Sequence, residues 1–283
     1  MNSPLLITDV PSHDAGVTLL REEGVHDLTC VLRKGEAEGA IRAWNRNGGD
    51  LSGIDLIALG DHMRGEASEM DAPVGLPTMI KGVPLEDLEQ LPRVIDRGRV
   101  DDADVVLLCG IPDLLVSVGI SRTIATIETL IDSHQTSIVI PILDVTPTSV
   151  VRGLAHYAEE VVEPIIDGQA MTLQPVTHVA GLSVETIFEL LAPPRRRALL
   201  LELDRAGEDV SLRQMAESVL DHPLGDHNWS VDRLLTALYQ IDIPRLVDTD
   251  LIKFDPERRT VGIRAEAIQV WPYLTVATQG SRI

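Results

Sequence analysis

The sequence predicts an α/β protein with a mainly parallel sheet, followed by a smaller C-terminal domain of helices and one hairpin. In the first 176 residues, short apolar runs alternate with segments of helical periodicity, which is typical of a parallel sheet flanked by helices. After residue 183 the order changes to helices followed by one hairpin. The 283 residues suffice for two cores, and we place the domains at residues 1–176 and 183–275.

The first domain is expected to contain five strands, five helices and a terminal hairpin. The most apolar run, 105–109, is typical of a central parallel strand that is buried on both faces. The turn at Asp167-Gly168 predicts an antiparallel hairpin between 160–164 and 169–175. Residues 60–77 show no period and are expected to form a loop. The other strands are expected at 4–10, 27–32, 54–59 and 137–143, and the helices at 17–23, 36–44, 86–95, 120–131 and 148–157.

The second domain begins with three short helices, expected at 184–191, 195–204 and 211–220. Ser183 and Ser211 stand at N-cap positions, and Gln214 gives Ser211 the spacing of a capping box. Gly207 is expected to end the second helix, because glycine adopts the left-handed conformation of a C-terminal cap without strain.

A fourth helix and a hairpin complete this domain and give it the order of a winged helix-turn-helix. Pro244 should kink or split the helix, which is expected at 229–246. Two β-prone runs, 251–254 and 260–263, flank a turn that contains Pro256 and predict a hairpin. Such a module offers a helix to a DNA groove and a hairpin tip to the phosphates. The buried face of the helix is expected to consist of Val231, Leu234, Leu235, Leu238 and Ile241.

The charge composition is unusual. The formal net charge is −20, and only three of the 24 cationic residues are lysine. Few lysines, few aromatics and abundant Asp resemble the composition of proteins from extreme halophiles. In their cytoplasm the Debye length falls below about 3 Å, so net charge says little about attraction to DNA. In ordinary salt, such an acidic chain would avoid nucleic acid.

The positive charge is relatively concentrated in the second half of the chain. Residues 1–182 carry 12 Lys or Arg against 28 Asp or Glu, whereas residues 183–283 carry 12 against 16. The winged-helix half is therefore less acidic, although it is not basic as nucleic-acid-binding domains often are.

The cysteine content and the hydropathy indicate a cytoplasmic protein. Cys30 and Cys109 end apolar runs and are expected to be buried thiols in a reducing compartment. The N-terminus does not resemble a signal peptide, and no apolar run approaches the roughly 20 residues that a membrane span requires. We expect no membrane partner.

The C-terminal half resembles an uncharacterised winged-helix family of halophilic archaea. The similarity rests on the runs 187–203, 211–219 and 237–255, which include an Arg triplet in an early helix and a Leu-Tyr pair shortly before Pro244. It covers roughly residues 185–275. The family usually has a glycine before the wing, where this chain has Thr249 and Asp250. The sharpness of that turn is left open.

The first 180 residues resemble, more distantly, a haloarchaeal family related to the RecA/KaiC ATPases. The runs 40–44, 104–109 and 155–163 carry this similarity. In KaiC-like proteins a phosphate loop follows the first strand and an Asp ends the central strand. Here no Gly-x-x-x-x-Gly-Lys-Ser/Thr occurs, and Cys109-Gly110 follow the central strand. We therefore expect a degenerate domain without catalytic residues or a cofactor, since ATP hydrolysis needs groups that neutralise the phosphates. Non-catalytic ligand binding at the carboxyl ends of the strands stays open.

No metal or catalytic site is expected. His222, Asp226 and His227 could hold a metal, but their spacing is irregular and a solvated loop is the simpler interpretation. No Ser/His/Asp or Cys/His motif is visible, although a triad assembled in space would escape a reading of the sequence.

The candidate DNA contacts lie on the helix expected at 229–246, on the wing and on the flanking helices. Arg233, Thr236 and Gln240 share a polar face of the helix, where they could meet base edges. The remaining candidates would hold phosphates. They are Arg195, Arg196, Arg197, Arg213, Arg245, Arg258 and Arg259. The alternative is that these arginines pair with nearby carboxylates, since Asp232, Asp242, Asp248 and Asp250 crowd the same helix.

The sequence thus predicts a transcriptional regulator whose C-terminal winged helix binds double-stranded DNA as a homodimer. The first domain would sense a ligand or mediate assembly. The alternative is a protein-interaction module whose winged helix dimerises or docks a partner. A nucleotide-binding enzyme is a minor third possibility.

Overall fold

The computed structural model of the chain describes residues 5–33, 36–60, 80–98, 105–133, 137–167, 170–176, 180–225 and 228–279. These residues form two compact units. The first consists of residues 1–113, 122–146 and 157–178, and the second of residues 114–121, 147–156 and 179–283. The second unit therefore includes two segments, 114–121 and 147–156, that the prediction assigned to the first domain.

The first unit is built on an eight-stranded sheet with the order β4-β3-β2-β5-β6-β1-β7-β8. All neighbours pair in parallel except β7 and β8, which form an antiparallel hairpin. This confirms the predicted α/β architecture, its mainly parallel sheet and the terminal hairpin. The strands are β1 (Leu5–Val10), β2 (Leu28–Arg33), β3 (Ile54–Gly60), β4 (Ile80–Pro84), β5 (Val105–Leu108), β6 (Ser137–Leu143), β7 (Glu160–Asp167) and β8 (Ala170–Pro175).

The centre of the sheet is apolar on both faces, as parallel strands between two helical layers require. In β2, Cys30 stands in register with Leu56 of β3 and with Leu107 of β5, and all three are fully buried. Cys109, directly after β5, is also buried. The two cysteines are free thiols, as predicted, and burial raises the pKa of both.

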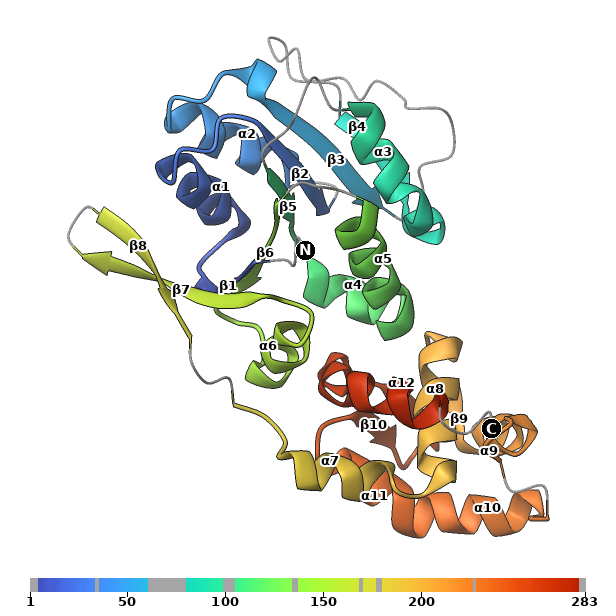
Figure 1. The fold of residues 1–283 in the computed structure, drawn as a ribbon. Helices are drawn as coiled ribbons and strands as arrows, with labels where there is room; N and C mark the ends of the chain where they lie inside the picture. Colours follow the sequence, from blue (N-terminus) through green and yellow to red (C-terminus); the bar gives the residue numbers. More distant parts are fainter. Residues whose placement is uncertain are drawn as a thin grey trace. The chain divides into compact units, whose positions relative to one another are not determined.

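Helices cover the two faces of this sheet (Figure 1). Helices α1 and α2 lie on one face, where Ala43 and Trp44 join the core, and α3 and α5 lie on the other. The strand β4, which the sequence interpretation missed, extends the sheet beyond β3. The loop expected at 60–77 lies outside the described residues except for Gly60, which ends β3. The helices are α1 (His13–Glu22), α2 (Ala37–Arg46), η1 (Leu51–Gly53), η2 (Leu85–Gln90), α3 (Leu91–Gly98) and α5 (Ile120–Ser133).

The second unit combines short helices with a three-stranded antiparallel sheet of order β10-β11-β9. Residues 114–117 of α4 (Ile111–Ser117) also belong to it. Its strands are β9 (Val210–Ser211), β10 (Ile252–Asp255) and β11 (Thr260–Ile263). Its other helices are α6 (Thr148–Ala155), α7 (Val184–Leu191), α8 (Pro194–Ala206), α9 (Leu212–Asp221), α10 (Val231–Ala237), η3 (Leu238–Asp242), α11 (Ile243–Val247), η4 (Ala265–Val270) and α12 (Trp271–Gln279).

The predicted helix caps of this unit are confirmed. The side chain of Ser183 accepts from the backbone N–H of Thr186, and that of Ser211 accepts from Gln214. Gly207 ends α8 in the left-handed conformation, with φ of 67°. These caps satisfy backbone groups that have no partner inside their own helix.

Close backbone packing brings the two early segments into the second unit. Gly153 of α6 packs against η4. A Cβ added at Gly153 would lie 2.4 Å from Cγ2 of Ile268 and 2.8 Å from the backbone nitrogen of Gln269. In the other segment, the backbone N–H of Ile120 donates to Asp204 Oδ1 of α8 at 2.6 Å. Among the described residues, no helix combines the length and hydropathy that crossing a bilayer requires.

Candidate nucleic-acid interface

The helix predicted to face a DNA groove is a continuous run of α10, η3 and α11 over residues 231–247. Ser230 caps it by accepting from the backbone N–H of Arg233. Its middle turn, Leu238–Asp242, is a π-helix. Pro244 has no N–H to donate to the carbonyl four residues before it, and a wider turn accommodates this loss. The predicted disturbance at Pro244 therefore takes the form of one π turn.

The π turn changes which residues face the core. Leu234 and Leu238 are buried as predicted, but Ile241 is 47% exposed, so its assignment to the buried face is wrong. Asp242 takes the inward position and is fully buried. The extra residue of the π turn rotates everything after Leu238 relative to a regular helix.

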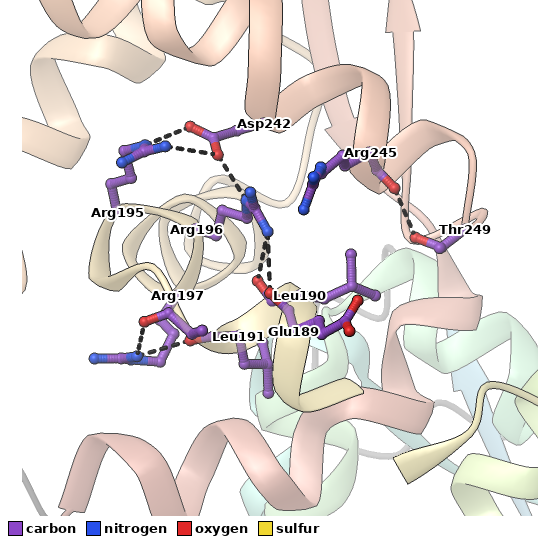
Figure 2. Close-up of polar contacts among 10 residues, drawn as sticks. Glu189, Leu190, Leu191, Arg195, Arg196, Arg197, Asp242, Arg245 and Thr249 are labelled. Atoms are coloured by element: carbon purple, nitrogen blue, oxygen red, sulfur yellow. Dashed lines mark hydrogen bonds and ion pairs between the residues drawn. The ribbon is translucent and has the colours of Figure 1, made fainter. Parts of the chain in front are cut away.

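Asp242 accepts hydrogen bonds from two arginines of α8 (Figure 2). Arg195 donates from Nε to Oδ2 at 2.6 Å and from Nη2 to Oδ1 at 3.3 Å. Arg196 donates from Nε to Oδ1 at 2.6 Å. A buried carboxylate is tolerated only when such charged donors compensate for its lost hydration. The three side chains form a buried cluster that ties α8 to the π turn.

The Arg triplet is thus largely taken up within the protein, which corrects the prediction that all three residues contact DNA. Arg196 is 3% exposed, and its Nη1 donates to the carbonyl oxygens of Glu189 and Leu190. Nη1 of Arg197 donates to the carbonyl oxygens of Leu191 and Ala192 at 2.7 and 3.1 Å. Figure 2 shows these guanidinium groups directed at the C-terminal end of α7. Because arginines there complement the helix dipole, their role is to hold α7 against α8.

Trp229, which the sequence interpretation did not single out, lies close to two cations. The guanidinium carbon of Arg233 is 4.3 Å from the centre of the indole, and that of Arg195 is 5.6 Å from it. Both distances fall within the range of a cation–π contact. The only signal for this role in the sequence is an aromatic residue beside the helix cap.

The remaining candidates on the helix are exposed. Thr236 and Gln240 lie in solvent, and the Thr236 hydroxyl donates to the carbonyl oxygen of Asp232 at 2.9 Å while its lone pairs stay available. Arg245 is also exposed. Its carbonyl oxygen accepts from Thr249, and its guanidinium carries no interaction in Figure 2.

The hairpin β10–β11 has an ordered tip at residues 256–259. Oδ1 of Asp255 accepts from the backbone N–H groups of Glu257 and Arg258 at 2.9 and 3.0 Å. The Arg258 side chain is 82% exposed and lies 3.8 Å from Asp255. Arg259 is exposed, with φ of 53°. A left-handed arginine is uncommon, because its Cβ crowds the following carbonyl oxygen.

The chain turns from the helix into the hairpin through Asp250, which also adopts the left-handed conformation, with φ of 57°. The backbone N–H of Asp250 donates to the carbonyl oxygen of Val247. The backbone N–H of Leu251 donates to the carbonyl oxygen of Leu246. These two bonds form a Schellman motif, in which glycine is the usual left-handed residue. Aspartate tolerates the conformation better than most residues, so the turn is sharp without glycine.

The carboxylates near the helix are mostly paired. Asp242 is buried with two arginines, and Asp250 lies 3.4 Å from Arg264. Asp232 lies 3.7 Å from Arg213, which also pairs with Glu217 at 3.4 Å. The acidity that the sequence places on this helix is therefore substantially offset by charges within the same unit. For Arg213, the predicted alternative of an ion pair is the arrangement present.

The predicted metal candidate His222 makes a structural hydrogen bond. Its Nδ1 accepts from the backbone N–H of Leu224 at 3.1 Å, which requires an unprotonated nitrogen there. Burial lowers the pKa of His222, and the carboxylate of Glu202 opposes this shift. Asp226 and His227 lie outside the described residues. The described part of the chain contains no cluster of three metal-ligating side chains.

In the first unit, the segment after β1, where the sequence lacks the expected phosphate loop, begins the capped helix α1. Ser12 follows β1 and accepts from the backbone N–H of Ala15, so it satisfies one of the N–H groups that open α1. After β5, Gly110 turns the chain with φ of 72°. Asp113 lies 3.7 Å from Arg33. The N-terminus of α1 is thus closed by its own cap.

Comparison with known proteins gives one family and several distant structures. A family model described as "Domain of unknown function (DUF7344)" matches residues 188–262, which run from α7 to β11. No curated protein matches the chain.

The solved structures that match are similar only at a low level. A protein from Pyrococcus horikoshii OT3 is 9% identical, with a TM-score of 0.41, and the alignment covers 62% of this chain and 88% of that one. A KaiC-like protein from the same archaeon is 14% identical, with a TM-score of 0.38, and the alignment covers 63% and 81%. The Drosophila ORC bound to GC-rich DNA and Cdc6 is 9% identical, with a TM-score of 0.28, and the alignment covers 98% and 86%. At these scores the similarities carry no argument about what the chain does.

Proposed function

We propose that the C-terminal unit is a winged helix-turn-helix that binds double-stranded DNA in a transcriptional regulator. The order α8, β9, α9, α10–α11, β10 and β11 supports this, as does the sheet in which β11 lies between β9 and β10. The exposed side of α10–η3–α11 would enter a groove, and the hairpin tip would follow the phosphates.

The observation that carries the proposal is the distribution of unpaired cations. Among the described residues of this unit, most arginines are tied to carboxylates or carbonyl oxygens. Arg233, Arg245 and Arg259 make no ion pair there, and all three belong to the helix or the hairpin tip. An acidic protein that leaves cations without carboxylate partners at these places provides positive charge that can bind phosphates.

The paired carboxylates also support DNA binding. Three of the four aspartates that crowd the helix in the sequence have cationic partners, and only Asp248 among them has none within the described residues. Repulsion of a phosphate strand is therefore weaker than the count of acidic residues suggests. Any remaining repulsion would be screened in the molar salt that we propose for a halophilic cytoplasm.

The test is the affinity for labelled double-stranded DNA from upstream of the gene, measured by fluorescence anisotropy at several KCl concentrations up to molar. We expect the triple variant Arg233→Ala/Arg245→Ala/Arg259→Ala to bind about tenfold or more weakly, with a shallower salt dependence. The matched control is Arg205→Ala, because Arg205 is exposed but pairs with Glu202 on α8. Equal affinities of the triple variant and the control, or no binding at any salt concentration, would refute the proposal.

For the first unit we propose a degenerate RecA/KaiC-like domain that senses a ligand or mediates assembly, without catalysis. The cap at Ser12 and the absence of a lysine in the segment 11–16 support this, since a phosphate loop needs free N–H groups and a cation. Calorimetry with ATP and magnesium tests it, and turnover of ATP would contradict it.

A second candidate function, the docking of a protein partner, is supported by apolar side chains on the same helix. Tyr239 and Ile241 are each almost half exposed, and Val247 is 37% exposed. Burying them in a homodimer or against a partner would remove apolar area from water. A stable complex that Ile241→Asp abolishes, in a protein that binds no DNA, would favour this alternative over the first proposal.

A further inference from the structure

The second unit contains a pocket of about 430 Å³ between the start of α8, the end of α9 and the start of α10. Its walls are mainly apolar, and two of them, Val219 and Leu234, belong to the core. Leu224, Trp229 and Arg195 also line it, and Arg195 is the charged residue among the described residues of its wall. A mainly apolar cleft of this size with one charged residue in its wall is a usual form of a small-molecule site.

The charge of the buried cluster is unbalanced at the wall of this pocket. Two guanidinium groups share the carboxylate of Asp242, and no second carboxylate of the described residues pairs with them, which leaves one positive charge in excess there. Arg196 is buried and uses its Nη1 on carbonyl oxygens. Arg195 is 27% exposed, and its Nη1 makes no hydrogen bond within the described chain. The excess charge is therefore accessible through Arg195 alone.

We propose that this pocket binds a small aromatic carboxylate. The aliphatic walls would hold the ring, and the indole of Trp229 offers a face or an edge for an aromatic contact. The outer edge of the Arg195 guanidinium would pair with the carboxylate, since the planar fork of arginine matches carboxylate geometry. The ligand would supply the second negative charge that the cluster lacks.

The pocket is linked to the helix through Trp229, which also contacts Arg233. A ligand that moves the indole would shift Arg233 on the surface that we propose for DNA. This consequence rests on the proposed function, whereas ligand binding itself does not.

The test is calorimetry and tryptophan fluorescence of the full chain in molar KCl without DNA, with phenylacetate as the probe. We expect saturable binding that quenches Trp229, because Trp44 and Trp271 are buried elsewhere. Phenylacetamide, which has the same ring without the charge, should bind about tenfold or more weakly.

Two variants change the pocket in different ways. Arg195→Met leaves one guanidinium with one carboxylate, and Leu224→Phe fills part of the cavity without touching the cluster. Each should weaken phenylacetate binding about tenfold or more, whereas Arg205→Ala should not. Absence of saturable binding, equal binding of phenylacetamide, or unchanged binding by Leu224→Phe would overturn the assignment. Because DNA is absent, these outcomes are independent of the DNA-binding test.

Discussion

The side chain of Asp242 accepts a hydrogen bond from Nε of Arg196 at 2.6 Å, and both residues are buried. This contact joins the π turn η3 to α8. It also explains why an aspartate follows the exposed Ile241 in an otherwise amphipathic helix. The exposed face of the helix that we propose for DNA binding and the interior of the unit are thus connected through one carboxylate.

We expect Asp242→Asn to destabilise the second unit by about 3 kcal/mol or more. The substitution keeps the shape of the side chain but leaves two guanidinium groups without a counter-charge, and breaking a buried pair on one side is costly. Urea unfolding in molar KCl, followed by circular dichroism, measures the change. Asp248→Asn is the control, because Asp248 is exposed on the same helix and should alter stability by about 0.5 kcal/mol or less. Equal midpoints for the two variants would contradict the role of the cluster.

Much of the fold was predictable from the sequence where the strands are buried on both faces of the sheet. The strands of the parallel sheet are apolar on both faces, so a continuous run such as Val105–Leu108 identifies them without knowledge of their neighbours. The strand β4 was missed because Lys81 and Gly82 interrupt its apolar character at the edge of the sheet. Edge strands need fewer apolar residues, and their pattern is correspondingly weaker.

The candidate site was less predictable, because its contacts join residues far apart in the chain. A regular helical period places both Ile241 and Asp242 near the inward face, whereas in the structure, with its π turn, Asp242 is buried and Ile241 is exposed. The sequence could suggest that the Arg triplet is free to contact DNA only if these arginines have no partner within the protein. Their partner Asp242 is 46 residues away from Arg196 in the sequence. Hydrophobic periodicity carries no information about such long-range pairs.

Substitution of Gly153 by alanine should destabilise the second unit by about 1–3 kcal/mol. An added Cβ would overlap with Ile268 and with the backbone of Gln269, so α6 would have to move away from η4. Thr148→Ala on the exposed side of α6 is the control and should have little effect. Denaturation of both variants in urea gives the comparison.

A double-mutant cycle identifies the contact responsible. Ile268→Ala removes the methyl group nearest to residue 153, so Gly153→Ala should cost less in that background than in the wild type. Equal costs in the two backgrounds would show that the overlap is with the backbone of η4 and not with the side chain of Ile268.

Acidification should weaken the second unit through His222. Burial lowers the pKa of His222 in the folded state from its usual 6.5, so the unfolded chain binds more protons as the pH falls. The contribution of His222 to the free energy of unfolding is therefore complete above about pH 6.5. It is lost as the pH falls towards the lowered pKa of His222 in the folded state. His222→Asn keeps an acceptor for the N–H of Leu224 but cannot titrate. Between about pH 7.5 and about pH 5.5, the wild type should lose more stability than this variant. Parallel losses measured by urea unfolding would remove His222 as the cause.

Arg259→Gly should make the hairpin more stable while it weakens DNA binding. At φ of 53° the arginine is strained, and glycine relieves about 1 kcal/mol of that strain. Arg258→Gly is the matched control, since it removes the same charge from the adjacent position, where φ is not positive. That change should cost about 0.5–1 kcal/mol, because glycine loses more backbone freedom on folding. Opposite effects of the two variants on the urea midpoint, together with weaker DNA binding by both, would mean that the chain keeps a strained residue at position 259 for the charge of its side chain. A lower midpoint for Arg259→Gly would show instead that the arginine stabilises the turn.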